Sequence, residues 1–236
     1  MIRSFFFNIF LVIHTVIFCL WDFIITSFDI GDNTFHFFVT RPWAKVILWV
    51  SGVKGRVTGL DNLQTGKPYI FMSNHQSYFD IFVLLANIPV GFKFIMKQEL
   101  MKIFLLGPAM RRSGHIGIER KDPKKAIQSM NRAAEKIKNG TSVLIFPEGT
   151  RSPDGRLQAF KKGGFHLAVK SGCDIVPVYI HGTNRIVPKG SLRINNKGMY
   201  KLYIGSPIQV KGCKKKDIPK LMKQVRDAML NCRLCD

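Results

Sequence analysis

The feature of this sequence that most limits its fold is an apolar run near the start. Phe5 to Trp21 reads FFFNIFLVIHTVIFCLW without a formally charged side chain, and the apolar character continues past Asp22 to Phe28. Such a stretch is costly to expose to water, so it must be buried in protein or in a membrane. A helix over residues 5–28 would be about 36 Å long at about 1.5 Å per residue, which is long enough to cross a bilayer.

Three polar residues interrupt the run at intervals of seven. Asn8, Thr15 and Asp22 therefore lie near one line on a helix, which indicates a helix in the membrane interface or one that faces a second helix. Residues 42–50 are a second apolar segment with two tryptophans, which are typical of membrane interfaces. We expect residues 1–52 to form a membrane-anchoring helical hairpin that dips into one leaflet. A helix that crosses the bilayer and a cleaved signal peptide are the alternatives, and no small-x-small cleavage site follows the run.

The charge balance is strongly basic. The chain of 236 residues has 36 Lys and Arg against 15 Asp and Glu, which gives a formal net charge of +21. A charge of this sign favours polyanionic partners such as anionic membrane lipid, nucleic acid or an acidic carrier protein. The five cysteines are scattered and odd in number, which disfavours a disulfide framework and fits a reducing compartment.

From residue 53 onward, strand and helix patterns alternate. The predicted strands cover residues 68–72, 92–96, 142–146, 175–180 and 200–204, and the predicted helices cover residues 78–86, 163–171 and the segments that begin at Asp122 and Asp217. The clearest helix begins at Asp122, because an N-cap aspartate is followed by proline, and Gly140 lies just past its end. The repeated order predicts an α/β fold over residues 53–236, with a mostly parallel mixed sheet flanked by helices.

The segment SNHQSYFD, residues 73–80, lies at the end of one predicted strand, where α/β folds bind ligands. Five residues on a regular helix would place His75 and Asp80 about 140° apart, so a contact between them requires His75 to precede the helix. Ser77-x-x-Asp80 has the form of a capping box, which would begin the helix at Ser77 and leave His75 in the loop. The same carboxylate could instead orient the imidazole and fix its tautomer, so that the other ring nitrogen takes a proton from a hydroxyl. Both interpretations of Asp80 remain open here. Since no G-x-S-x-G segment supplies a nucleophile, a substrate hydroxyl would have to serve.

Three further motifs accompany the histidine. Residues 146–152 read FPEGTRS after another predicted strand; the glycine permits close backbone approach, and Arg151 offers a planar fork suited to phosphate. Residues 114–120 read GHIGIER, and residues 176–180 read VPVYI. Each of these motifs alone also fits an ordinary turn or strand.

In order and spacing, N-H-x-x-x-x-D at residues 74–80 and these three motifs resemble the four sequence blocks of the glycerolipid acyltransferase family. The sequence looks like the bacterial members that make phosphatidic acid from 1-acylglycerol 3-phosphate, and the resemblance covers residues 68–180. It implies the fold of that family and direct transfer of a fatty acyl chain from a thioester to the sn-2 hydroxyl of lysophosphatidic acid. It also implies that His75 is the general base and that Asp80 orients it. The residues that match the blocks for the acceptor and its phosphate are Arg120, Glu148, Gly149, Thr150 and Arg151.

The resemblance further implies the partners and the location. The acyl donor would be acyl-CoA or acyl carrier protein, and no metal or other cofactor is required. We expect binding to anionic lipid at the cell inner membrane, with the catalytic domain, residues 53–236, on the cytoplasmic face. Lys97, Lys161 and Lys162 are additional candidates for phosphate binding.

Several alternatives remain open at this point. The acceptor could be another lysolipid or glycerol 3-phosphate, and a thioesterase would use water in place of the acceptor hydroxyl. A membrane-tethered nucleic-acid-binding protein would use the same basic charge. The last alternative is disfavoured, because the sequence contains no nucleic-acid-binding signature and its aromatic residues cluster in the N-terminal run.

Overall fold

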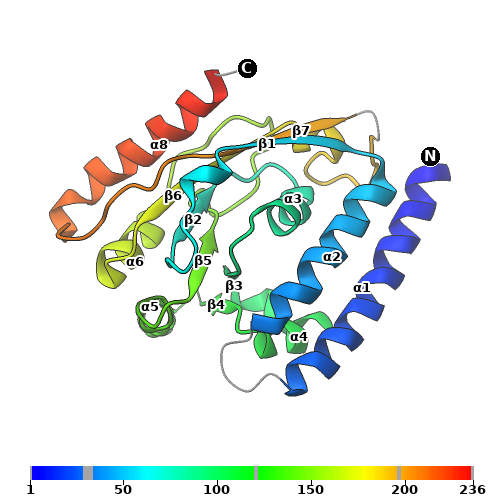
Figure 1. Ribbon diagram of the computed structural model, residues 1–236, viewed down its shortest axis with the longest axis horizontal. Helices are drawn as coiled ribbons and strands as arrows, with labels where there is room; N and C mark the ends of the chain where they lie inside the picture. Colours follow the sequence, from blue (N-terminus) through cyan, green and yellow to red (C-terminus); the bar gives the residue numbers. More distant parts are fainter. Residues whose placement is uncertain (1, 29–33, 120–121, 196–197, 235–236) are drawn as a thin grey trace.

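The computed structural model describes residues 2–28, 34–119, 122–195 and 198–234, and it begins with two long helices. α1 (Ile2–Phe28) and α2 (Thr34–Ser51) pack against each other, and α2 also packs on α3 (Phe79–Asn87). Figure 1 shows both helices along one flank of the molecule. The two apolar segments found in the sequence thus form adjacent helices.

Within the described residues, seven strands form one sheet in the order β1-β7-β6-β2-β5-β3-β4. Their bounds are β1 (Lys54–Thr58), β2 (Ile70–Ser73), β3 (Phe92–Lys97), β4 (Ile116–Ile118), β5 (Ser142–Ile145), β6 (Ile175–His181) and β7 (Met199–Ile204). Neighbouring strands pair in parallel except β6 and β7, which are antiparallel. The structure therefore confirms the mostly parallel mixed sheet, with β1 and β7 running opposite to the other strands.

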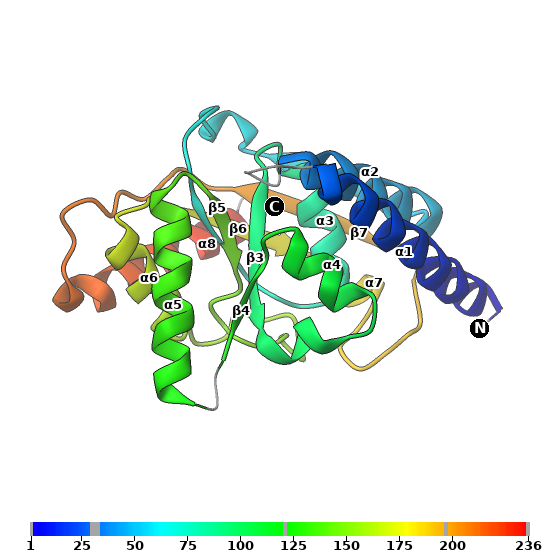
Figure 2. The same ribbon diagram turned by 90° about the horizontal axis from the view of Figure 1, so that it is seen from below.

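The sheet is covered by helices on both faces. The side chains of β2 alternate between the two faces, so that Phe71 joins the core under α2 and α3, whereas Ile70 and Met72 join the core on the other side. That second core is covered by α5 (Pro123–Lys138), α6 (Gly163–Ser171) and α8 (Ile218–Leu234). Figure 2 shows these three helices on one side and the N-terminal helices with α3 on the other.

The start of α5 confirms its sequence prediction. One side-chain oxygen of Asp122 accepts hydrogen bonds from the backbone N–H groups of Lys124 and Lys125, at 2.9 and 3.2 Å. Gly140 follows the helix with a φ of +93°, a left-handed conformation that glycine adopts without strain. The elements that the sequence patterns did not predict are β1, β4, α4 (Leu106–Arg112), α7 (Thr183–Ile186) and the short 3₁₀ helices η1 (Leu60–Asn62), η2 (Gln98–Lys102) and η3 (Lys215–Asp217).

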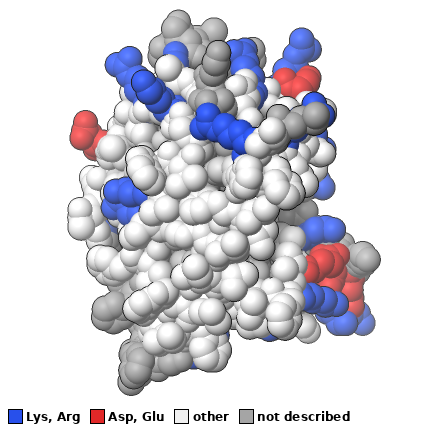
Figure 3. Space-filling model, turned by 90° about the vertical axis from the view of Figure 1, so that its right-hand side faces the viewer, with Lys and Arg blue, Asp and Glu red and all other residues white. Residues whose placement is uncertain are grey.

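The N-terminal flank presents a large apolar surface. Among the described residues, one helical segment, Ile2–Ile25, is long and apolar enough to cross a membrane, with a mean hydropathy of 2.1. Only 17% of its most apolar 18-residue stretch is buried within the protein. Trp49 of α2 and Phe104 before α4 add to the exposed apolar side chains, at 81% and 87% exposure. Figure 3 views this flank, which is mostly uncharged and has lysines and arginines along its upper edge.

Candidate active site

His75 lies between the end of β2 and the start of α3. Its ring stacks on the ring of Phe146, which follows β5, with centroids 3.9 Å apart and planes 14° apart. Because β2 and β5 are parallel neighbours, their carboxyl ends meet at the same edge of the sheet. The fold therefore brings the H-x-x-x-x-D segment and the FPEGTRS segment together.

Asp80 contacts the histidine and caps the helix with the same oxygen. Its carboxylate is completely buried, and Oδ2 accepts from His75 Nδ1 at 2.8 Å and from the N–H groups of Gln76 and Ser77 at 2.7 and 2.9 Å. Ser77 Oγ in turn accepts from the N–H of Phe79, the first residue of α3. The His–Asp contact is therefore present, together with one half of the predicted capping box, the bond from the Ser77 N–H to Asp80. The other half is absent, because the N–H of Asp80 donates to the Ser77 carbonyl and not to Oγ, and α3 begins at Phe79 rather than at Ser77. A proton on Nδ1 directed at Asp80 leaves Nε2 as the basic ring nitrogen.

Glu148 holds the backbone of His75. Its side chain is 3% exposed; Oε1 accepts from the His75 N–H at 2.7 Å, and Oε2 accepts from the Gln158 N–H at 2.8 Å. The His75 carbonyl accepts from the N–H of Ser152 at 2.7 Å. Burial raises the pKa of Glu148 above its ordinary value, and the N–H groups of Gln158 and His75 partly offset this effect. The FPEGTRS segment therefore fixes both backbone polar groups of His75.

The next three residues of that segment face a cavity. Gly149, Thr150 and Arg151 line it together with His75, whereas Glu148 does not. The sequence motif groups Glu148 with these three residues. The order of residues in a motif does not show to which side each side chain turns. Gly149 has a φ of +74°, and a Cβ added there would lie 3.0–3.1 Å from the side chain of Lys161.

The cavity has a volume of about 610 Å³ and a mostly apolar lining. Its walls come from α1, α2, α3, β3, α4 and the end of β5, and Lys97 also lines it. A hydrogen bond joins α1 to the end of α4: Asp22, which lines the cavity, accepts from Ser113 Oγ at 2.8 Å. His75 therefore lies at the wall of a mostly apolar cavity.

Tyr78 is the residue directly before α3. Tyr78, which sequence reasoning did not single out, has a buried Oη without a hydrogen-bond partner among the described residues. Burial raises the pKa of Tyr78, and nearby Arg151 acts in the opposite direction. Its position inside the H-x-x-x-x-D segment was the available signal. Arg120, a predicted phosphate ligand, lies outside the described residues.

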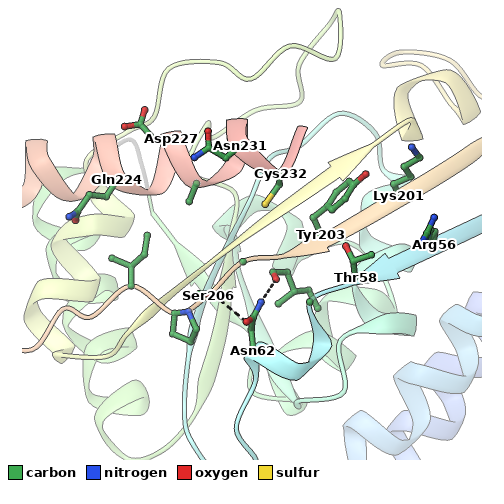
Figure 4. Close-up of a pocket in the computed structure, with 16 residues that line it drawn as sticks. Arg56, Thr58, Asn62, Lys201, Tyr203, Ser206, Gln224, Asp227, Asn231 and Cys232 are labelled. Carbon is green, nitrogen blue, oxygen red and sulfur yellow. Dashed lines mark hydrogen bonds between the residues drawn. The ribbon is translucent and has the colours of Figure 1, made fainter. Parts of the chain in front are cut away.

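A larger and more open groove of about 990 Å³ lies elsewhere, between α8 and the outer strands β1 and β7. Figure 4 shows polar side chains in its lining, including Thr58, Asn62 and Asn231, and the groove shares no lining residue with the cavity at His75. Because β1 and β7 run opposite to β2, their carboxyl ends lie at the edge of the sheet opposite to the carboxyl end of β2. The His–Asp pair therefore belongs to the smaller, apolar cavity.

Comparison with known proteins places these features in a family. Residues 54–181 match a family model described as acyltransferase. Over 182 residues the chain is 41% identical to a chloroplastic 1-acyl-sn-glycerol-3-phosphate acyltransferase of Arabidopsis thaliana, covering 77% of this chain and 51% of the relative. The bovine 1-acyl-sn-glycerol-3-phosphate acyltransferase alpha is 31% identical over 201 residues, covering 85% of this chain and 70% of the relative.

A solved structure agrees with the fold over nearly the whole chain. The crystal structure of the 1-acyl-sn-glycerophosphate acyltransferase of Thermotoga maritima superposes with a TM-score of 0.83 and 27% identity, covering 97% of this chain and 92% of that one. The chain spans about half the length of the plant relatives that it matches. The superposition on the Thermotoga maritima structure includes the N-terminal helices, which lie outside the residues covered by the family model.

Proposed function

The chain belongs to the acyltransferase family, and on this basis we propose that it transfers a fatty acyl group from a thioester to the sn-2 hydroxyl of lysophosphatidic acid, giving phosphatidic acid. One observation carries this proposal: the His75–Asp80 pair lies beside a mostly apolar cavity of about 610 Å³ whose lining also includes Arg151. The cavity suits a fatty acyl chain, the pair suits activation of a hydroxyl, and the guanidinium suits a phosphate. The names of the relatives support the same acceptor.

In the proposed reaction, His75 is the general base. Nε2 takes the proton of the acceptor hydroxyl while the hydroxyl oxygen attacks the thioester carbonyl carbon. The new ester C–O bond forms, the C–S bond breaks, and the proton passes from His75 to the departing thiolate. Asp80 holds the ring through Nδ1 and stabilises the imidazolium that forms between these two proton transfers.

The phosphate of the acceptor is proposed to lie against the basic residues at the same edge. Arg151 and Thr150 line the cavity, and Gly149 lets the phosphate approach the backbone. Arg120 keeps its role from the resemblance as a phosphate ligand. Lys97 lines the cavity and Lys161 lies over Gly149, so both can add positive charge, whereas Lys162 is exposed at the start of α6.

The apolar cavity is proposed to hold the acyl chain that is transferred. Each methylene that leaves water for such a cavity contributes about 0.8 kcal/mol, so the cavity would set both affinity and chain-length preference. The donor is acyl-CoA or acyl carrier protein, and its acidic character complements the net charge of +21. The proposed transfer needs no metal and no other cofactor, and it involves no nucleic acid.

The N-terminal helices are proposed to anchor the protein in a membrane. Residues 1–52 form the anchor, and residues 53–236 form the catalytic domain. The exposed apolar side chains of α1 and α2 would enter one leaflet, and the lysines and arginines along the edge of that flank would meet anionic head groups. We propose the cytoplasmic face of the cell inner membrane as the location, because the acyl donors are soluble.

The test is phosphatidic acid formation by the purified full chain on liposomes that contain lysophosphatidic acid, with acyl-CoA and acyl carrier protein as donors. We expect product with at least one donor, loss of product in His75→Ala, and retention in His166→Ala, a matched control at an exposed position of α6. Absence of product with both donors would overturn the proposed acceptor, and other lysolipids and glycerol 3-phosphate would then be tried. Fatty acid release that does not require lysolipid would indicate a thioesterase.

A further inference from the structure

The C-terminal helix reaches the loop that follows the FPEGTRS segment. Arg226 of α8 donates from one terminal nitrogen to the carbonyl of Gln158 at 2.7 Å and from the other to the carbonyl of Leu157 at 3.1 Å. Its guanidinium also lies over the ring of Phe160, 5.7 Å from the centroid. Arg226 lies outside residues 54–181, the part of the chain that the family model matches.

Gln158 is hydrogen-bonded to both Arg226 and Glu148. The carbonyl of Gln158 accepts from Arg226, and its N–H donates to Glu148 Oε2. The other oxygen of Glu148 accepts from the N–H of His75. Three consecutive hydrogen bonds thus connect α8 to the backbone of the proposed base, across segments that are 73 and 68 residues apart in sequence.

The loop needs this support because it has no regular secondary structure. Residues 156–161 form neither helix nor strand, so sheet and helix hydrogen bonds do not fix their backbone. A carbonyl left without a partner in a half-buried loop is costly, and two adjacent carbonyls suit the planar fork of an arginine. Lysine offers one compact ammonium group and cannot reproduce both bonds in the same geometry.

We propose that Arg226 is a positioning residue for the acyl transfer, which holds the loop at residues 157–158 so that Glu148 fixes His75. This inference rests on the proposed function of His75. Arg226 is not part of the cavity lining, so its effect on the rate is indirect. A shift of about 1 Å in a catalytic group is enough to lower a rate by up to about 100-fold, so a modest relaxation of the loop would be measurable.

The first measurement compares steady-state kinetics of Arg226→Ala and Arg226→Lys with the parent, at a temperature well below all melting transitions. Arg226→Ala is expected to lower kcat on the order of tenfold with the acceptor KM within about twofold, and Arg226→Lys to recover part of the loss. Lys223→Ala is the matched control, because Lys223 lies on the same helix in an exposed ion pair with Asp227. An Arg226→Ala variant that melts earlier but keeps the parental kcat would show a purely structural role and overturn the proposal.

The second measurement does not depend on activity. Hydrogen exchange followed by mass spectrometry reports on peptides that cover residues 73–80 and 155–160. We expect Arg226→Ala to speed exchange in both peptides and Lys223→Ala in neither, because the amides of His75 and Gln158 share Glu148 as acceptor. Faster exchange at residues 155–160 with parental protection at 73–80 would contradict the proposed connection. If the parent makes no phosphatidic acid, the proposed function fails, while the exchange result still tests the connection.

Discussion

Replacing Asp80 by asparagine separates the two tasks that its carboxylate performs. Oδ2 accepts one hydrogen bond from the His75 ring and two from the backbone N–H groups of Gln76 and Ser77, in the turn before α3. Asparagine has nearly the same shape and can keep an oxygen in the same place, so helix capping survives in form. The negative charge opposite the imidazole does not survive.

The expected magnitudes follow from these three bonds. A hydrogen bond to a charged group contributes about 1.5–3 kcal/mol against about 1 kcal/mol for a neutral one, so the change should cost about 3 kcal/mol of stability in all. The new amide nitrogen would take the place of Oδ1, which is already buried without a hydrogen-bond partner among the described residues, so no further hydrogen bond is lost there. For the reaction, loss of the charge at the base is expected to lower kcat about 10³- to 10⁴-fold, or about 4–5.5 kcal/mol of barrier.

The assay is kcat at saturating substrates and low temperature, beside a denaturant titration of the same preparation. Asp122→Asn is the control, because Asp122 caps α5 with two backbone hydrogen bonds at an exposed site and asparagine caps about equally well. We expect Asp122→Asn to lower the free energy of unfolding by less than about 0.5 kcal/mol and to keep the parental kcat. If Asp80→Asn loses stability but keeps more than about a tenth of the parental kcat, Asp80 is a helix cap only and the proposed dyad is wrong.

Four further outcomes are expected. Because the pKa of Glu148 is raised, the folded protein binds a proton at this carboxyl more tightly than the unfolded chain, in which the carboxyl has its ordinary pKa of 4.5. The stability advantage of the parent over Glu148→Gln should therefore shrink as the pH rises from below 4.5 through the raised pKa. Paired denaturant titrations across that range measure it, and an advantage that grows would contradict the assigned direction. Gly149→Ala should cost about 1–2 kcal/mol and also lower kcat, because it forces a left-handed alanine against Lys161, whereas Gly140→Ala, in open space at a similar φ, should cost stability alone. Equal kinetic effects in the two would refute a role of Gly149 in the site. Phe104→Ser should weaken liposome binding about tenfold in a flotation assay without changing the melting temperature, since this ring is 87% exposed. Unchanged flotation would remove Phe104 from the proposed membrane contact. Ala109→Leu narrows the cavity wall and should disfavour the longest accepted acyl chains about fourfold per excluded methylene in a donor competition, and an unchanged product profile would place the acyl chain elsewhere.

The sequence predicted the parts of the fold that depend on local patterns. Strands such as β2 and β5 are short apolar runs, and their place before helices determines a parallel sheet with both motifs at one edge. The start of α5 was equally local, since Asp122 and the following proline act on residues within one turn. The antiparallel β7 and its neighbour β1 were not predicted as such, because strand direction depends on the path of long connections rather than on side-chain pattern.

The candidate site shows the same division. The contact between His75 and Asp80 was predicted only as one of two alternatives, because a spacing of five residues fits a cap and a dyad equally, and one oxygen performs both. The orientation of Glu148 was not predictable, since its partners are the backbone groups of residues 10 and 73 positions away. Arg226 gave no sequence signal for a similar reason, because its partners are carbonyls, which every residue carries.

Three polar residues of α1, Asn8, Thr15 and Asp22, face the rest of the protein. Asn8 donates to the carbonyl of Leu192 at 2.9 Å, Thr15 lines the apolar cavity, and Asp22 accepts from Ser113. From Asn8 to Asp22 these residues therefore face the α/β part of the protein, and the hydrogen bond to Ser113 accounts for an aspartate in an apolar segment. A helix that is hydrogen-bonded at Asn8 and at Asp22 to the α/β part of the protein cannot cross a bilayer without drawing that part into it. We therefore expect α1 to lie in a single leaflet, where the cavity that it lines is within reach of a lipid acceptor that remains in the membrane.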